Sequence, residues 1–192
     1  MPRRPSLTRD QVIRAAADLV RAEGPSALNA RRIAAALHCS TQPLFTLFDT
    51  MEEIRRAVIE EARRRFDAFV RARIERKDEP PYKAVGMAYA AFAGEEPELF
   101  RLLFMRDRRG EQANDEDAWS AYIAMPQKQL GLERGEADLF HLEMWAFVHG
   151  LAVMAATGYE NLSEDLISRV LTEAYQALAA GKGRKKENDE RH

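Results

Sequence analysis

The chain has 192 residues, of which 46% are hydrophobic and 31% charged; this supports a sizeable core and excludes global disorder. No apolar run approaches the roughly 20 residues that cross a bilayer, and none follows Arg3 and Arg4 as in a secretory signal. The single cysteine, Cys39, excludes an intramolecular disulfide and a cysteine cluster for zinc. We therefore expect a cytoplasmic protein with no membrane partner, no metal and no cofactor.

The net charge of −2 is unevenly distributed along the chain. Residues 1–48 hold seven arginines and three acidic residues, a net charge of +4, which leaves −6 for the remainder. A basic N-terminal portion on an acidic body is typical of a chain that places one end on nucleic acid. Random scatter of charge over solvated helix faces would give the same numbers, so charge alone leaves both interpretations open.

The first expected element is a helix that follows an unstructured arm at residues 1–7. Thr8 and Gln11 form a capping-box pattern at its start, and Gly24 followed by Pro25 ends it. Apolar residues recur between these ends at helical spacing: Val12, Ile13, Ala16, Leu19 and Val20. The spacing predicts a helix that is buried along one stripe.

Residues 28–48 are predicted to form two short helices joined by a tight turn at 38–40. Asn29 is placed to cap the first helix, and Ser40 or Thr41 to cap the second. Their inward-facing apolar positions are Ile33, Ala34, Leu37, Leu44, Leu47 and Phe48. Short polar groups on the outer side suit the floor of a DNA groove, so the pattern is that of a helix-turn-helix.

A long helix is predicted from Thr50, where Glu53 completes a second capping-box pattern, to about Arg76. Five further helices are expected at about 81–93, 99–105, 117–131, 136–157 and 161–178. The predicted fold is therefore all-α with about nine helices. We place a helix-turn-helix DNA-binding domain at 1–52, a ligand-binding and dimerisation domain at 53–180, and a disordered charged tail at 181–192.

The segment EGPSALNARRIAAALHCSTQPLFTLFDTMEEI, residues 23–54, resembles the TetR family of transcriptional regulators. The residues that carry the resemblance are Gly24, Ile33, Ala34, Ser40, Leu44, Phe45, Phe48 and Ile54. Trp145, His149 and Gly150 are similar to the Trp-His-Gly feature of one C-terminal subgroup. The resemblance implies a homodimer, paired through its eighth and ninth helices, that binds double-stranded operator DNA. It also implies a repressor that a small, largely apolar effector releases from DNA.

The sequence departs from the family pattern near the recognition helix. The family usually has Tyr where Phe45 stands, His where Leu47 stands and Lys where Met51 stands, and His38 replaces the usual glycine of the turn. Phosphate contacts supply much of the affinity for DNA. The alternative function is therefore a small-molecule-binding dimer with weakened or lost DNA binding. An enzyme is disfavoured, because no Ser–His–acid or paired-carboxylate set is present.

Two groups of candidate site residues follow. The candidates for DNA contact are Arg3, Arg4, Asn29, Arg31, Thr41, Gln42, Phe45 and Thr46. Glutamine can bond adenine in the major groove, while Arg3 and Arg4 either enter the minor groove or stay a solvated arm. The candidates for the effector pocket are Tyr89, Phe92, Phe104, Met105, Trp119, Trp145 and His149. The alternative for His149 is a core or interface histidine.

Overall fold

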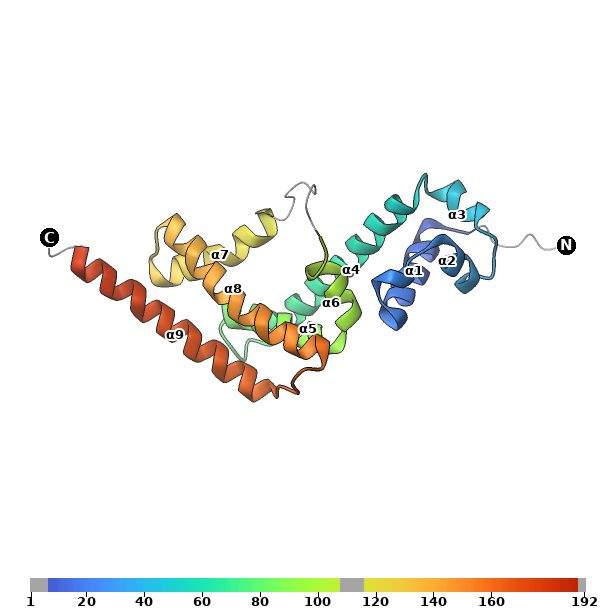
Figure 1. Cartoon of the computed structure of the whole chain (residues 1–192). Coiled ribbons are helices and arrows are strands. Elements are labelled where there is room, and N and C mark those ends of the chain that lie inside the picture. Colours follow the sequence, from blue (N-terminus) through green and yellow to red (C-terminus); the bar gives the residue numbers. More distant parts are fainter. Residues whose placement is uncertain (1–6, 108–115, 190–192) are drawn as a thin grey trace. The chain divides into compact units, whose positions relative to one another are not determined.

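The fold is all-α, as the helical spacing predicts. The structure, a computed structural model, describes residues 7–107 and 116–189, with side chains described for 7–107 and 120–182. Within these residues it contains nine α-helices and one short 3-10 helix (Figure 1). They are α1 (Arg9–Glu23), η1 (Pro25–Ala27), α2 (Ala30–Ala36), α3 (Gln42–Leu47), α4 (Met51–Glu75), α5 (Pro81–Glu95), α6 (Pro97–Phe104), α7 (Glu116–Leu130), α8 (Arg134–Thr157) and α9 (Glu164–Asp189).

Capping residues determine where several helices begin. The Thr8 side chain accepts a hydrogen bond from the Gln11 backbone N–H, and the Gln11 side chain accepts from the Thr8 N–H, which confirms the predicted capping box. Asn29 caps α2 and Ser163 caps α9, each accepting from the backbone N–H three residues on. Thr41 makes no capping bond, so that predicted cap is wrong. Its backbone is already helical, whereas a side-chain cap needs an extended residue.

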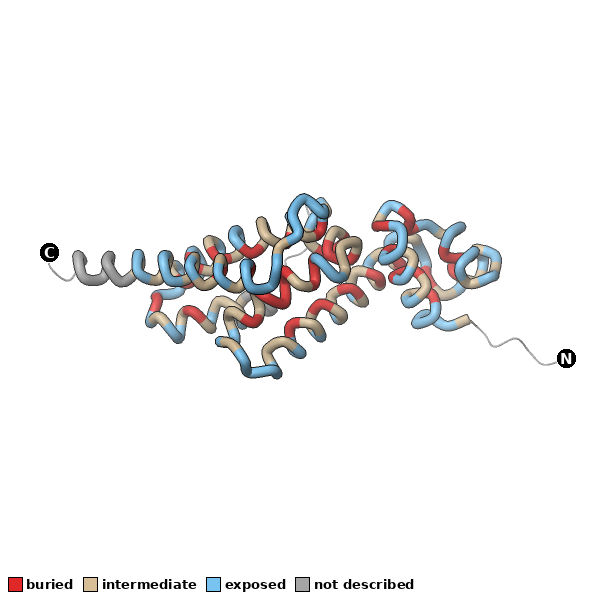
Figure 2. Tube along the Cα trace, turned by 90° about the horizontal axis from the view of Figure 1, so that it is seen from below, coloured by how far each residue is buried: buried red, intermediate tan, exposed pale blue. Residues whose placement is uncertain are grey.

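The chain folds into two compact units, and α4 belongs to both. The described part of unit 1 covers residues 7–68 and 96–107, and that of unit 2 covers 69–95 and 116–189. Unit 1 thus extends along α4 beyond the expected domain boundary at residue 52 and includes α6. Buried residues recur along the helices of each unit at intervals of three or four (Figure 2). This is the packing expected of amphipathic helices.

Unit 1 is held together by an apolar core between α1, α2, α3, α4 and α6. Its fully buried side chains include Val12, Ala16, Val20, Ile33, Leu44, Ile54, Leu99 and Leu103. An ion pair adds to the contact between α6 and α1. The Arg21 guanidinium donates two hydrogen bonds to the Glu96 carboxylate, at 2.7 and 2.5 Å. These bonds raise the pKa of Arg21. The start of α6 is therefore fixed to the end of α1 in a bidentate geometry.

Gly24 shapes the same junction. Its φ of 86° lies in the left-handed region that favours glycine. A Cβ at this position would lie 2.8 Å from the Glu98 carboxylate of α6. The residue therefore ends α1 and also leaves room for α6.

In unit 2, α5 packs against α7, α8 and α9. The side chains that fill the space include Ala84, Met87, Ala88, Tyr89, Phe92, Phe140, Met144, Val148 and Leu171. Gly86 allows a close approach of α9, because a Cβ there would lie 3.1 Å from Cδ1 of Leu171. Small residues on α5 therefore set the spacing of the helices around it.

α8 is longer and more apolar than one buried face requires. Among the described residues it is the helix whose length and composition would suffice to cross a membrane, with 28% of the qualifying window buried. The count of uninterrupted apolar residues did not predict this, since polar residues interrupt every run. α8 packs against α5, α7 and α9, as a core helix of a helical domain does. Its remaining apolar surface stays exposed.

In the C-terminal half the end of α9 differs from the sequence expectation, and α7 contains an internal proline. Residues 181–189 continue α9 to Asp189, whereas a disordered tail was expected from residue 181. Lysine, arginine and glutamate are good helix formers, and they extend the helix although it has no apolar face there. α7 also continues through Pro126, which is buried within it.

Candidate nucleic-acid interface and effector region

The turn between α2 and α3 brings their apolar faces together. Ile33, Leu44 and Phe48 are buried with at most 1% of their surface exposed. His38 has a φ of 52°, the conformation for which the family's usual glycine is suited. Cys39 is partly buried, and its backbone N–H donates to the Ala34 carbonyl at 3.0 Å. The predicted helix–turn–helix geometry is therefore present.

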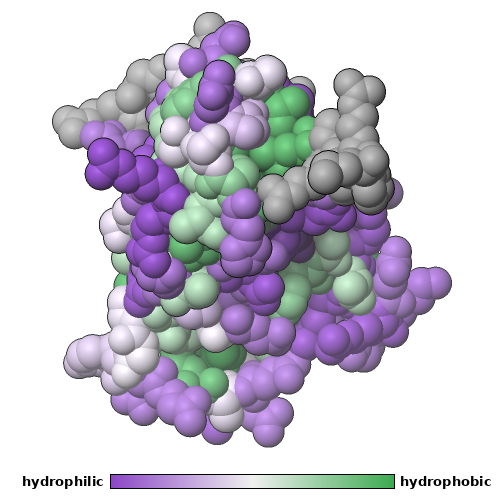
Figure 3. Space-filling model, turned by 90° about the vertical axis from the view of Figure 1, so that its right-hand side faces the viewer, coloured by the Kyte–Doolittle hydropathy of each residue, from purple (hydrophilic) through white to green (hydrophobic). Residues whose placement is uncertain are grey.

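The outward face of α3 carries three of the predicted DNA contacts. Gln42, Phe45 and Thr46 are exposed, and 45% of the Phe45 surface is accessible. The Thr46 hydroxyl donates to the Gln42 carbonyl at 3.1 Å, so it is already bonded within the helix. Thr41 is only partly exposed. Figure 3 views the molecule from the side that carries α1–α3 in Figure 1, where apolar patches lie among hydrophilic surface.

The structure distinguishes the two neighbouring arginines of α2. Arg32 pairs with Glu23, whereas Arg31 is exposed and has no ion pair or hydrogen bond of its side chain within the described residues. Asn29 uses both ends of its amide: its oxygen accepts from the Arg32 N–H and its nitrogen donates to the Ala27 carbonyl. Of the two arginines, Arg31 is therefore the one whose guanidinium has no protein partner among the described residues. The predicted arm residues Arg3 and Arg4 lie outside the described residues.

Arg9 is a structural residue that the sequence reasoning missed. Its guanidinium lies over the Phe48 ring, 4.0 Å from the centroid, and donates to the Leu47 carbonyl and, at 2.5 Å, to the Glu53 carboxylate. Glu53 also accepts from the Asp49 N–H at 2.8 Å, and the bond from Arg9 lowers the pKa of Glu53. Arg9 thus connects the start of α1 to the C-terminal end of α3 and to the first turn of α4. No local signal points to it, because its partners are about 40 residues away.

Three of the predicted effector residues come together in unit 2. The Tyr89 hydroxyl and Nδ1 of His149 share a hydrogen bond of 2.9 Å. The His149 ring stacks on Trp145, with centroids 4.8 Å apart and an angle of 21° between the planes. Burial lowers the pKa of His149, so the neutral imidazole is favoured. A second pair, Tyr82 and His141, repeats the tyrosine–histidine bond at 2.9 Å.

The other predicted effector residues are described by contacts or exposure of their own. Phe92 is buried and meets Phe69 edge to face, with centroids 5.7 Å apart. Phe104 and Met105 belong to unit 1, where Phe104 packs against Phe66 at 5.2 Å and Met105 is 45% exposed. The side chain of Trp119 lies outside the described residues. Tyr89, Trp145 and His149 are the predicted effector residues whose mutual contacts the structure describes.

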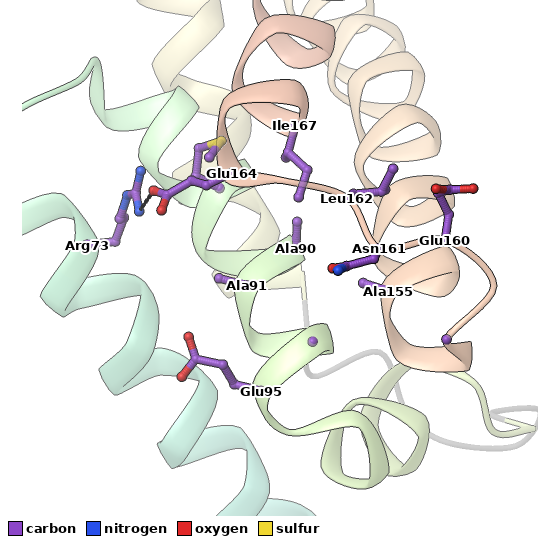
Figure 4. A pocket seen from close by; sticks show the side chains of 13 residues that line it. Arg73, Ala90, Ala91, Glu95, Ala155, Glu160, Asn161, Leu162, Glu164 and Ile167 are labelled. Carbon is purple, nitrogen blue, oxygen red and sulfur yellow. Dashed lines mark hydrogen bonds and ion pairs between the residues drawn. The ribbon is translucent and has the colours of Figure 1, made fainter.

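A pocket of about 420 Å³ lies elsewhere in unit 2 and shares no residue with the predicted set. The C-terminal half of α5, the end of α8, the segment before α9 and Arg73 of α4 line it (Figure 4). Arg73 is held by Glu79 and Glu164, each at 2.5 Å, and the bonds raise its pKa. Within the described residues no group of three or more potential metal ligands was found.

Solved structures share this fold over nearly the whole chain. A TetR-like transcriptional regulator from Rhodococcus sp. RHA1 is 16% identical, with a TM-score of 0.67 over 93% of this chain and 98% of its own. A protein of unknown function from the same organism is 21% identical, with a TM-score of 0.70 over 94% and 98%. A TetR-family protein from Vibrio parahaemolyticus is 18% identical, with a TM-score of 0.58 over 88% and 97%. No curated protein matches the sequence.

The fold and the helix-turn-helix define a DNA-binding regulator of the all-α class. A family model described as the tetracyclin repressor-like C-terminal domain matches residues 82–178, which is half of the chain. The chain therefore belongs to the TetR family of transcriptional regulators, which are not enzymes. The resemblance of residues 23–54 and the match to the C-terminal half thus agree.

Proposed function

We propose that this regulator is a dimeric repressor that binds operator DNA through α2 and α3. The observation that carries the proposal is the division of α3 into two faces. Leu44 and the adjoining Phe48 are buried, while Gln42, Phe45 and Thr46 are exposed. A recognition helix packed in this way presents its outer face to the major groove. Arg31, unpaired within the described residues, supplies a phosphate contact.

A second copy of the chain is the proposed partner of α8 and α9. Four exposed apolar residues of α8 and one of α9 support this: Leu139, Leu142, Phe147, Met154 and Leu166, each between 38% and 57% exposed. At 100° per residue the four on α8 fall within an arc of about 140°, so they share one broad face. Exposed apolar patches of this kind mark interaction sites. A dimer would place two recognition helices on successive turns of DNA, about 34–36 Å apart.

The proposed effector is small and largely apolar, and it contacts Tyr89, Trp145 and His149. The rings supply apolar surface, and the tyrosine–histidine bond supplies a polar group that fixes orientation. Trp145 and His149, together with Gly150, support membership of the Trp-His-Gly subgroup. The effector would favour a state whose recognition helices no longer match adjacent grooves, and so release the DNA. A cytoplasmic location follows from the DNA partner.

The test is a gel-shift assay with the DNA upstream of the protein's own gene, over a series of salt concentrations. A salt-sensitive, sequence-selective shift is expected. Arg31→Ala should weaken it and reduce the salt slope by about two, because the dimer loses one phosphate contact per subunit. Arg71→Ala is the matched control, since Arg71 is an exposed arginine of α4 outside the helix-turn-helix and the proposed dimer helices. Absence of any selective shift at every concentration would contradict the proposal.

A dimer that binds small molecules but has lost DNA binding is the second candidate. The observation that favours it is Phe45, which cannot donate to a phosphate as the family's tyrosine does. This candidate predicts a dimer that gains thermal stability with ligand and produces no selective gel shift. The gel-shift assay, together with a thermal-stability assay with ligand, therefore separates the two candidates.

A further inference from the structure

We propose that the recognition helix reads thymine by its C5-methyl group, through the ring of Phe45 and the methyl of Thr46. The inference rests on the proposed operator binding and adds the chemical feature of the base that is read. It assigns the role of the two residues by the groups that they expose on α3.

Phe45 exposes an apolar ring on the face of α3 that is proposed to enter the major groove, where few groups of DNA are apolar. Its side chain is on the exposed side of α3, with 45% of the residue accessible, while Leu44 beside it is buried. The ring has no hydrogen-bond donor or acceptor, so it reads neither a base edge nor a phosphate by hydrogen bonding. Thymine has the one apolar group on the major-groove edge of the four bases. Contact with this methyl would remove apolar surface of both partners from water.

Thr46 lies next to Phe45, and its hydroxyl proton is already used. Oγ1 donates to the Gln42 carbonyl at 3.1 Å within α3, so the hydroxyl has no second proton to donate to DNA. The methyl is the apolar group that the exposed side chain presents. Gln42 completes the face. Its exposed amide makes no hydrogen bond within the described residues, and glutamine pairs well with adenine N6 and N7. Adenine read by Gln42 and thymine methyls read by its neighbours together specify A·T pairs.

The test compares thymine with uracil, which differ only by the methyl. The full chain first selects its site from a random duplex library. Each dT of that site is then replaced by dU, and Kd is measured by fluorescence anisotropy at one salt concentration. We expect at least one position at which loss of a methyl weakens binding about fourfold, from roughly 0.8 kcal/mol per methyl. The two equivalent positions of a dimer site together should give about fifteenfold.

Variants of Phe45 connect the effect to its ring. Phe45→Ala should bind the dT and dU sites equally at the sensitive position, whereas Phe45→Tyr keeps the ring and should keep the sensitivity. Met105→Ala is the matched control, because Met105 is also 45% exposed but lies on no DNA-binding helix. Its dT-to-dU ratio should equal that of the wild type. Circular dichroism confirms that each variant is folded.

Two substitutions separate the methyl of Thr46 from its hydroxyl. Thr46→Val keeps the methyl and should keep the affinity, while Thr46→Ser keeps the hydroxyl and should weaken binding severalfold. The inference is overturned if a selected site binds equally with dT and dU at every position, or if Phe45→Ala retains the dU effect at every sensitive position. If no site is selected at all, the proposed operator binding fails as well, which is a distinguishable result.

Discussion

His38 occupies a left-handed backbone conformation, φ 52°, in the turn of the helix-turn-helix. A residue with a Cβ is destabilised by about 1–2 kcal/mol in this conformation, and a β-branched side chain is destabilised more. We expect His38→Gly to unfold at higher urea concentration than His38→Val, by roughly 2 kcal/mol in free energy of unfolding. Equal stability of the two variants would show that the turn relaxes. Lys77, with a φ of 57°, offers the same comparison outside this motif.

His149 should make stability depend on pH in the acid range. Burial lowers its folded-state pKa below 6.5, so above pH 6.5 the imidazole is neutral in both the folded and the unfolded chain. Below that pH the unfolded chain takes up a proton that the folded chain resists, and the free energy of unfolding falls. Urea unfolding at pH 5.5 and 7.5 should give a smaller loss for His149→Gln than for the wild type. An unchanged loss would place the pH dependence elsewhere, for example at partly buried His141, whose pKa is also lowered by burial.

Residues differ in how far the sequence reveals them. The caps at Thr8 and Asn29 were predictable because donor and acceptor are three residues apart. Arg9 was not, because its contacts to Phe48 and Glu53 depend on the way that α1 packs. Likewise, which of the two arginines of α2 is paired depends on where Glu23, the last residue of α1, lies. Arg32 pairs with it and Arg31 stays exposed. Long-range ion pairs need the fold first.

At the scale of elements, the Arg21–Glu96 pair should contribute to the packing of α6 on α1. Its bidentate geometry favours a value near the top of the range for exposed pairs, since Arg21 is 44% exposed. A double-mutant cycle with Arg21→Ala and Glu96→Ala should give a coupling of about 0.5–1 kcal/mol, which decreases with salt. The more exposed Arg134–Asp138 pair within α8 is the control, with an expected coupling of about 0.3–0.5 kcal/mol. Equal coupling energies for the two pairs would show that the Arg21–Glu96 pair contributes no more to the packing of α6 than an ordinary surface pair does.

Most helices were predictable from apolar spacing, and their ends from glycine. α1 ends at Gly24 and α8 at Gly158, as expected. The second half of α9 was not predictable in this way, because residues 181–189 have no apolar face and only helix propensity remains. Which of the effector candidates lie side by side was not predictable for a related reason. Helical spacing shows which face of a helix is apolar, but it does not show which helix faces it across the core.

For the whole molecule, the exposed face of α8 leads to a prediction about assembly. Leu142→Glu with Phe147→Glu places two charges on the stripe proposed to meet a second copy, where burying them unpaired is costly. Sedimentation should show a dimer for the wild type and a monomer for the double variant. Met105→Glu, on an equally exposed apolar residue of unit 1, should remain a dimer. A dimer in all three proteins would move the interface away from this stripe.

The described part of unit 1 is assembled from two separate stretches of the chain, residues 7–68 and 96–107. An engineer who grafts this DNA-reading head onto another regulator must therefore exchange both stretches. A graft of 1–68 alone would leave Arg21 without Glu96 and Gly24 beside a foreign α6. The backbone also passes between the units three times, so one proteolytic nick cannot release the head as a fragment. Each unit is thus compact in the fold, although unit 1 is not one continuous stretch of the sequence.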